Sequence, residues 1–208
     1  MNSPDSPLPS LATGRTITLA SGSAPRLRLL RAAGVEVQAR PADLDEAALK
    51  RTGQARGDGA DAVALALAAA KAGASGEAGW VIGADQLLVC EGAWFDKPAD
   101  LGEARRHLER LRGRAHVLHT AVVLAHGGRV VWRHVAHPRL VMRAVSDGFV
   151  DAYLAAEGEA LLASVGAYRL EGLGLQLFSA VRGEHGAILG LPMLPLLGAL
   201  RQRGLLAV

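Results

Sequence analysis

Apolar and polar positions in the first half of the chain follow two different periods. Short apolar or alternating segments at 17–20, 35–39 and 80–84 are typical of strands, and Asp85 closes the third. Segments with apolar residues at helical spacing begin at Pro25 and cover 58–73 and 101–111. This alternation of strands and helices predicts an α/β fold.

The second half of the chain favours antiparallel pairing. Segments 87–90 and 93–95 flank Glu91-Gly92, and segments 117–125 and 129–135 flank a turn at 126–128, so each pair predicts a hairpin. Apolar segments at 173–180 and 187–189 flank another turn, Ser146 is an N-cap candidate, and Pro192 opens a last helix. We therefore predict a mixed β-sheet flanked by helices.

The length and composition bound the domain organisation. The chain has 208 residues, of which 50% are hydrophobic, so one large domain or two small lobes sharing a core can be buried. Residues 1–15 are rich in Ser and Pro and contain no apolar signal segment, which predicts a disordered N-terminal tail. Residues 16–208 then form the folded domain.

Charge and cysteine content exclude several classes of protein. The net charge is only +3, and acidic residues interrupt the arginines at 105–114, which favours a solvated helix face over a nucleic-acid surface. The single cysteine, Cys90, cannot form an internal disulfide and fits a reducing compartment. No apolar segment reaches the length needed to span a membrane. We expect a soluble cytoplasmic protein that binds neither nucleic acid nor membrane.

The segment Ser21-Gly-Ser23 with Pro25 and Arg26 is a candidate anion site. A predicted strand ends there in a loop of small residues, and a helix begins with Arg26 in its first turn. Unpaired N–H groups at a helix N-terminus favour an anion, and the planar guanidinium suits phosphate. The alternative is an ordinary strand–turn–helix with a surface arginine.

Lysines and carboxylates supply further candidates. Only three lysines occur beside twenty arginines, and Lys71 and Lys97 follow helical and turn-like segments, respectively. Asp85 follows a buried strand, where ligands bind in open α/β sheets, and Glu46 follows a loop. Cations and carboxylates in one site suit a nucleoside triphosphate with Mg²⁺. The alternatives are surface lysines, a turn aspartate and a helix-start glutamate.

The histidines do not predict a metal site. His116 and His119, like His134 and His137, are three positions apart in strand-like segments. Side chains at that spacing on a strand point to opposite faces, so neither pair is expected to share a ligand.

A set of short motifs follows in order along the chain after residue 16. They are Leu19-Ala-Ser-Gly-Ser23, Gly34-Val35, Asp45-Glu46, Ala70-Lys71-Ala72, Ile82-Gly-Ala-Asp85, Lys97-Pro98, Leu111-Arg-Gly-Arg-Ala-His116, His119-Thr-Ala121, Gly166-Ala-Tyr168, Glu171-Gly172 and Gly190-Leu-Pro192. In this order and at this spacing, they resemble those of the Maf family of nucleoside triphosphate pyrophosphatases.

The resemblance implies an activity and a site. It implies cleavage of a nucleoside triphosphate to the monophosphate and pyrophosphate with a divalent cation, Mg²⁺ or Mn²⁺. It also implies a mixed α/β fold of two lobes with a central cleft, commonly as a homodimer. Asp85 matches the proton acceptor, and Asp85 and Glu46 are the expected metal ligands. The expected substrate-binding residues are Ser21, Ser23, Arg26, Glu46, Lys71, Lys97 and Glu171.

Branch-specific positions favour a guanine-type substrate. Asp85-Gln86 and Glu171 resemble the branch that prefers 7-methyl-GTP, and Ser164 replaces a lysine of the pyrimidine-preferring branch. Pro25, however, stands where the 7-methyl-GTP branch carries tryptophan. Guanine offers adjacent N–H donors that one carboxylate can accept, whereas an amide suits uracil or thymine better. The alternatives are a dTTP/UTP pyrophosphatase, a phosphatase that releases single phosphates, and a non-catalytic nucleotide-binding regulator of cell division.

Overall fold

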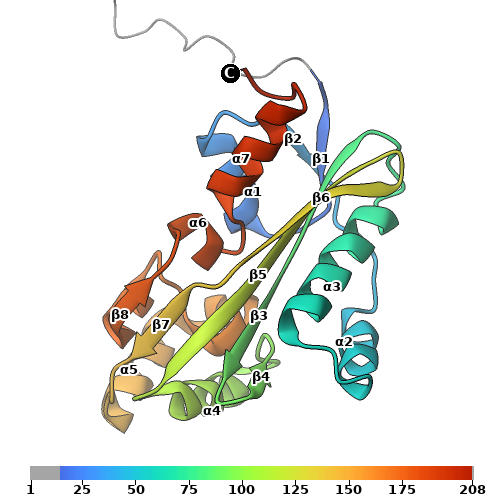
Figure 1. Ribbon diagram of the computed structural model, residues 1–208. Helices are drawn as coiled ribbons and strands as arrows, with labels where there is room; N and C mark the ends of the chain where they lie inside the picture. The colour runs from blue at the N-terminus through green and yellow to red at the C-terminus, as the bar shows by residue number, and fades with distance from the viewer. Residues whose placement is uncertain (1–14, 208) are drawn as a thin grey trace, which may run out of the picture. The chain divides into compact units, whose positions relative to one another are not determined.

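The computed structural model describes residues 15–207, and an eight-stranded mixed sheet organises them (Figure 1). The strand order is β2-β1-β3-β5-β7-β8, with β4 also paired to β3 and β6 also paired to β5. The chain divides into two compact units. Their described parts are 15–85, 121–135 and 190–207 for unit 1, and 86–120 and 136–189 for unit 2. The predicted tail lies, apart from Arg15, outside the described residues.

Unit 1 contains the parallel part of the sheet. Strand β1 (Ile17–Leu19) pairs in parallel with β2 (Val37–Ala39) on one side and with β3 (Trp80–Cys90) on the other. The helices of this unit are α1 (Ala24–Ala32), α2 (Glu46–Ala55), α3 (Ala60–Ala74) and α7 (Met193–Gln202). One core joins α1, α7 and the alternate β3 residues Ile82 and Ala84. The intervening β3 residues therefore face the other side of the sheet.

Unit 2 contains the antiparallel part. Strand β5 (Ala115–His126) begins here and pairs with β7 (Arg139–Met142), which pairs with β8 (Phe178–Arg182). Strand β4 (Ala93–Phe95) turns back on the end of β3. The helical elements are α4 (Leu101–Leu111), α5 (Asp147–Glu157), α6 (His185–Ile188) and three 3₁₀ turns, η1 (Gly158–Ala163), η2 (Val165–Ala167) and η3 (Leu173–Leu177).

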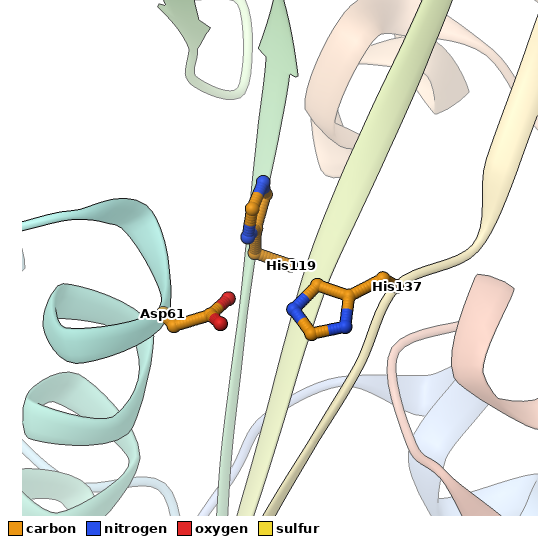
Figure 2. A group of neighbouring side chains, drawn as sticks. All are labelled: Asp61, His119 and His137. Carbon is orange, nitrogen blue, oxygen red and sulfur yellow. The ribbon is translucent and has the colours of Figure 1, made fainter.

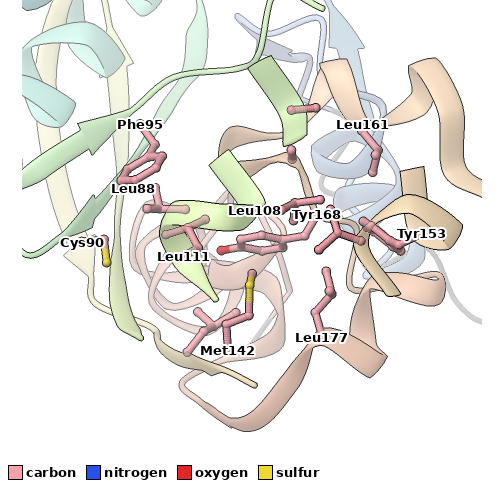
Figure 3. Close-up of a cluster of buried hydrophobic side chains, with 14 of the residues drawn as sticks. Leu88, Cys90, Phe95, Leu108, Leu111, Met142, Tyr153, Leu161, Tyr168 and Leu177 are labelled. Atoms are coloured by element: carbon pink, nitrogen blue, oxygen red, sulfur yellow. The ribbon is translucent and has the colours of Figure 1, made fainter. Parts of the chain in front are cut away.

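Large apolar side chains fill the centre of unit 2 (Figure 3). Leu108 and Leu111 of α4 pack with Leu88 of β3 and with Leu161 of η1. Tyr168 follows η2 and lies in the same cluster. This core fixes the 3₁₀ turns, which have few backbone hydrogen bonds of their own, against regular elements.

Both predicted hairpins are confirmed, and their turns explain why. Gly127 and Gly128, between β5 and β6 (Arg129–Ala136), have φ of 57° and 73°. Glu91 and Gly92, between β3 and β4, have φ of 50° and 79°. Two successive positive φ values match the right-handed twist of paired strands.

Three sequence-based expectations differ from the structure. Asp85 does not close a strand, because β3 continues without interruption to Cys90. Of the two apolar segments predicted to flank a turn, 173–177 forms η3 and 187–188 belongs to α6. Strand β7 was not predicted, since four residues after Pro138 carry too short a pattern. The remaining predicted strands and helices are confirmed within a few residues.

Among residues 15–207, every helix is too short or too polar to cross a bilayer.

Candidate active site

The loop between β1 and α1 has the predicted strand–loop–helix form. Ser23 caps α1, and its Oγ accepts a hydrogen bond from the Arg26 backbone N–H at 3.5 Å. Ser21 Oγ accepts from the Ser23 N–H at 3.2 Å, which tightens the loop. Pro25 occupies the first turn, where its missing N–H costs nothing. The predicted polar loop at the end of β1 is therefore present in unit 1.

Arg26 is buried within unit 1 rather than displayed on the surface. Its Nε donates to the Gly190 carbonyl at 2.8 Å, and its Nη1 donates to Ser21 Oγ at 3.1 Å and to the Ala84 carbonyl at 2.9 Å. The side chain joins the loop, β3 and the segment before α7. Burial lowers the pKa of the guanidinium, while the charges of Asp85 and Glu46 act in the opposite direction.

Position 190 is shaped by that guanidinium. Gly190 has φ of 99°, and a Cβ there would lie 3.1 Å from Arg26 Nε. Any other residue at position 190 would therefore strain the backbone and crowd the Arg26 side chain. The glycine lets the carbonyl reach Arg26.

Lys71 on α3 lies between two carboxylates. Its Nζ is 2.6 Å from Asp85 Oδ1 and 2.9 Å from Glu46 Oε2. The Lys71 and Asp85 side chains are 11% and 7% exposed, whereas that of Glu46, at the start of α2, is 47% exposed. One ammonium therefore neutralises part of a two-carboxylate site that opens toward solvent on the Glu46 side.

Gly83 brings α3 close enough for this contact. A Cβ at position 83 would lie 2.1 Å from the Ala68 carbonyl oxygen and 3.0 Å from Ala72 Cβ. Gly83 and Asp85 are two positions apart on β3, so they face α3 together. The missing side chain at 83 allows Lys71, one turn from Ala68, to reach Asp85.

The second oxygen of Asp85 is the chemically open atom of the site. Asp85 Oδ2 is buried and has no hydrogen-bond partner among the described residues. A buried carboxylate oxygen without a protein partner is costly, and a bound water or ion is the usual partner of such an atom. Asp85 thus offers one oxygen to Lys71 and one to a water or a cation.

Two of the eight predicted site residues belong to unit 2. Lys97 is exposed in the loop after β4, and Glu171 is exposed in the turn between η2 and η3. Unit 1 brings together the other six, which are Ser21, Ser23, Arg26, Glu46, Lys71 and Asp85. The participation of Lys97 and Glu171 stays a prediction.

Sequence reasoning missed one charged anchor in unit 2. Glu157 is the last residue of α5, and its side chain is only 7% exposed. Its Oε2 lies 2.8 Å from Arg169 Nη1. Its pattern resembles an ordinary helix end. The following Gly158, with φ of 56°, is a local signal of an unusual backbone.

Histidines from different predicted pairs do meet in unit 2. His119 of β5 and His137, between β6 and β7, have ring centroids 5.3 Å apart, and Figure 2 draws both. Figure 2 also labels Asp61, which belongs to α3 of unit 1. Residue spacing within one strand says nothing of neighbours on other segments, so this pair could not be predicted from it. Imidazoles suit transition metals, whereas Mg²⁺ prefers oxygen ligands such as those of Asp85 and Glu46.

The family comparison agrees with this geometry. The model of the Maf-like protein family matches residues 16–203. The chain belongs to the Maf family. The Maf match spans the whole carboxylate–lysine site, and Asp85, Lys71 and Arg26 all lie inside it.

Curated Maf relatives cover nearly the whole chain. A nucleoside triphosphate pyrophosphatase of Gluconobacter oxydans is 54% identical over 196 residues, covering 92% of this chain and 97% of the relative. The protein of the same name from Granulibacter bethesdensis is 51% identical, covering 92% and 99%. A 7-methyl-GTP pyrophosphatase of Mesorhizobium japonicum is 48% identical, covering 90% and 96%.

Proposed function

We propose that this Maf protein hydrolyses a nucleoside triphosphate to the monophosphate and pyrophosphate with a divalent cation. The buried, unpartnered Asp85 Oδ2 beside Lys71 and Glu46 is the observation that carries the proposal. The names of the relatives, nucleoside triphosphate pyrophosphatase and 7-methyl-GTP pyrophosphatase, support the same activity. Residues 16–208 act as one functional domain.

The proposed reaction is attack of water on the α-phosphorus. The water oxygen bonds to the phosphorus, the bond to the β-phosphate oxygen breaks, and pyrophosphate leaves. Asp85 Oδ2 orients the water and takes its proton, while Lys71 holds Oδ1 at 2.6 Å and fixes the position of the carboxylate.

The neighbouring charges bind the triphosphate. Asp85 and Glu46 offer the oxygen ligands that Mg²⁺ or Mn²⁺ prefers, and such a cation would neutralise charge on the phosphate oxygens. The N-terminus of α1, beside the loop at 21–23, attracts the anion through the helix dipole. Arg26 supports this loop from within through Ser21, and Lys97 supplies a further cation.

Glu171 favours guanine as the base. Its carboxylate can accept both adjacent N–H groups of the guanine edge, a pairing that the dTTP and UTP bases do not offer. The 48% identical 7-methyl-GTP pyrophosphatase supports this choice. We also propose a cytoplasmic homodimer without nucleic-acid or membrane partners, because the single cysteine and modest net charge fit that setting.

A substrate panel tests the proposal. The full-length protein is incubated with GTP, 7-methyl-GTP, dTTP and UTP, each with Mg²⁺, with Mn²⁺ and after chelation, and both phosphate products are measured. We expect pyrophosphate and monophosphate, fastest from the guanine substrates, and loss of turnover after chelation. Release of orthophosphate would identify a phosphatase instead, and tight binding without turnover a nucleotide-binding regulator.

A further inference from the structure

The turn that carries Glu171 is closed on itself within unit 2. The Gly172 N–H donates to the Arg169 carbonyl at 3.2 Å, and the Leu175 N–H donates to the Gly172 carbonyl at 3.3 Å. A Cβ at Gly174 would lie 2.4 Å from the Arg169 carbonyl oxygen, so the chain packs tightly against its own start. Glu171 projects from a turn whose backbone is well defined.

Glu157 of α5 holds this turn on both sides of Glu171. One carboxylate oxygen, Oε2, pairs with Arg169 Nη1 at 2.8 Å. The other, Oε1, accepts the Leu173 N–H at 3.0 Å. These partners stand two residues before and two residues after Glu171, so a single buried carboxylate brackets it.

Two neighbouring features show that the turn is built around this carboxylate. A Cβ at position 172 would lie 2.7 Å from Glu157 Oε1, so Gly172 leaves the space that the carboxylate fills. The Arg169 N–H donates to the hydroxyl of Tyr153, one turn before Glu157 on α5, at 3.2 Å. Burial raises the pKa of that Tyr153 hydroxyl to about 12, so it stays a neutral partner.

We propose that Glu157 is a positioning residue for base selection. It fixes the turn 169–173 and thereby aims the Glu171 carboxylate at the guanine edge. This inference rests on the proposed function of Glu171. Two parallel hydrogen bonds to one base need a fixed donor–acceptor geometry, and a shift of about 1 Å is enough to lose them.

A positioning role differs measurably from a purely structural one. If Glu157 only stabilised unit 2, its loss would lower the melting temperature and leave the relative rates on different bases unchanged. If it aims Glu171, its loss raises KM for guanine substrates and leaves kcat at saturation close to that of the wild type, because the phosphate-binding residues lie on other elements.

The experiment compares three variants of the full chain. Glu157→Ala removes both contacts, Glu157→Gln keeps an acceptor for the Leu173 N–H but loses the charge facing Arg169, and Glu159→Gln changes an exposed glutamate of η1 as the matched control. For Glu157→Ala we expect the GTP-to-UTP ratio of kcat/KM to fall about tenfold, through KM. This ratio should fall less in Glu157→Gln, and in Glu159→Gln it should equal that of the wild type. An unchanged ratio in Glu157→Ala would overturn the proposal.

A double variant and hydrogen exchange separate this proposal from the activity itself. Because Glu157 acts through Glu171, Glu157→Ala should add no further loss of selectivity to Glu171→Ala. In the ligand-free protein, amides of 169–175 should exchange faster in Glu157→Ala than in Glu159→Gln. If the wild type hydrolyses no triphosphate, the proposed function fails. The role of Glu157 is then tested by the ratio of GTP to UTP affinities, compared between the wild type and Glu157→Ala. Unchanged exchange or an unchanged affinity ratio would refute it.

Discussion

The two units bury polar groups in different ways. Of the described residues, those that carry a charge and are buried as whole residues are Arg26, Lys71 and Asp85, and all three lie in unit 1. Unit 2 buries neutral groups by the same measure, namely His107, His116 and Thr120. Buried charges cost free energy, so these three residues mark a part of unit 1 where stability is given up for chemistry.

The buried polar groups of unit 2 have a structural role by contrast. His116 Nε2 lies 2.9 Å from the Tyr168 hydroxyl, inside the apolar cluster. Gln86 Nε2 donates to Thr120 Oγ1 at 2.8 Å and to the Ala187 carbonyl at 3.0 Å, which joins β3, β5 and α6. Neutral pairs of this kind specify how elements pack, and they need no ion.

Among the variants that test this difference between the units, Asp85→Asn should have the largest effect. An amide keeps a hydrogen-bonding oxygen but cannot take a proton, so we expect kcat to fall at least about 10²-fold while the protein stays folded. Asp43→Asn, in the exposed loop before α2, is the matched control. Steady-state kinetics with a melting curve decide the matter, and near-normal turnover by a folded Asp85→Asn protein would remove Asp85 from its role.

Removal of the shared cation should destabilise unit 1. Lys71→Met leaves the buried Asp85 carboxylate without its partner at 2.6 Å, so the free energy of unfolding should fall by about 3 kcal/mol. Lys50→Met on α2 removes a less buried lysine and should cost much less. Urea titrations of the two variants measure the difference. Equal losses would mean that the buried pair contributes no more than a surface lysine.

A pH experiment tests the neutral character of unit 2. Burial lowers the pKa of His116 from 6.5 to about 4 in the folded chain. Above pH 6.5 the ring is neutral in both states, and its environment contributes fully. As the pH falls below 6.5, the unfolded chain takes up a proton that the folded chain refuses, so stability should decline by about 3 kcal/mol down to about pH 4.

The histidine effect is isolated by difference. Subtracting the stability curve of His116→Gln from that of the wild type removes the contribution of the carboxylates, and we expect the slope between pH 6.5 and 4 to remain in the difference. His126→Gln, which changes an exposed ring, serves as the control. If the stability curves of the wild type and of His116→Gln were parallel, His116 would not contribute to the loss of stability in acid.

The smallest expected change in stability comes from Glu46→Gln. The Glu46 side chain is 47% exposed, so loss of its contact with Lys71 should cost at most about 1 kcal/mol. If Glu46 is a metal ligand, the Mg²⁺ concentration for half-maximal activity should nevertheless rise about tenfold. A metal titration beside a melting curve tests both parts, and an unchanged metal requirement would leave Glu46 as a surface partner of Lys71.

The sequence predicted the elements of the site better than their contacts. Ser23 as the cap, Pro25 in the first turn and Arg26 after it follow from local rules about helix starts. The burial of Arg26 does not, because its acceptors at Ala84 and Gly190 are distant in sequence and depend on how unit 1 folds.

The surroundings of Asp85 and Glu157 also depend on partners that are distant in sequence. Two polar residues at 85 and 86 interrupt the apolar pattern and suggest a strand end, yet β3 continues because each side chain finds a partner, Lys71 for Asp85 and Thr120 for Gln86. Glu157 has the pattern of a solvated helix end, and only the fold of 169–173 over it makes it buried. Local propensity cannot anticipate such long-range partners.

The core of unit 1 is built from three separate segments of the chain. This composition limits the order in which the two units can fold. Leu191, Leu196 and Leu200 fill its interior, and the carbonyl that holds Arg26 comes from Gly190. Among residues 15–207, the apolar cluster of unit 2 contains no residue beyond Ile188. As the nascent polypeptide leaves the ribosome, unit 2 can thus fold first, whereas the contacts of Arg26 in unit 1 form only once Gly190 and α7 have emerged from the exit tunnel.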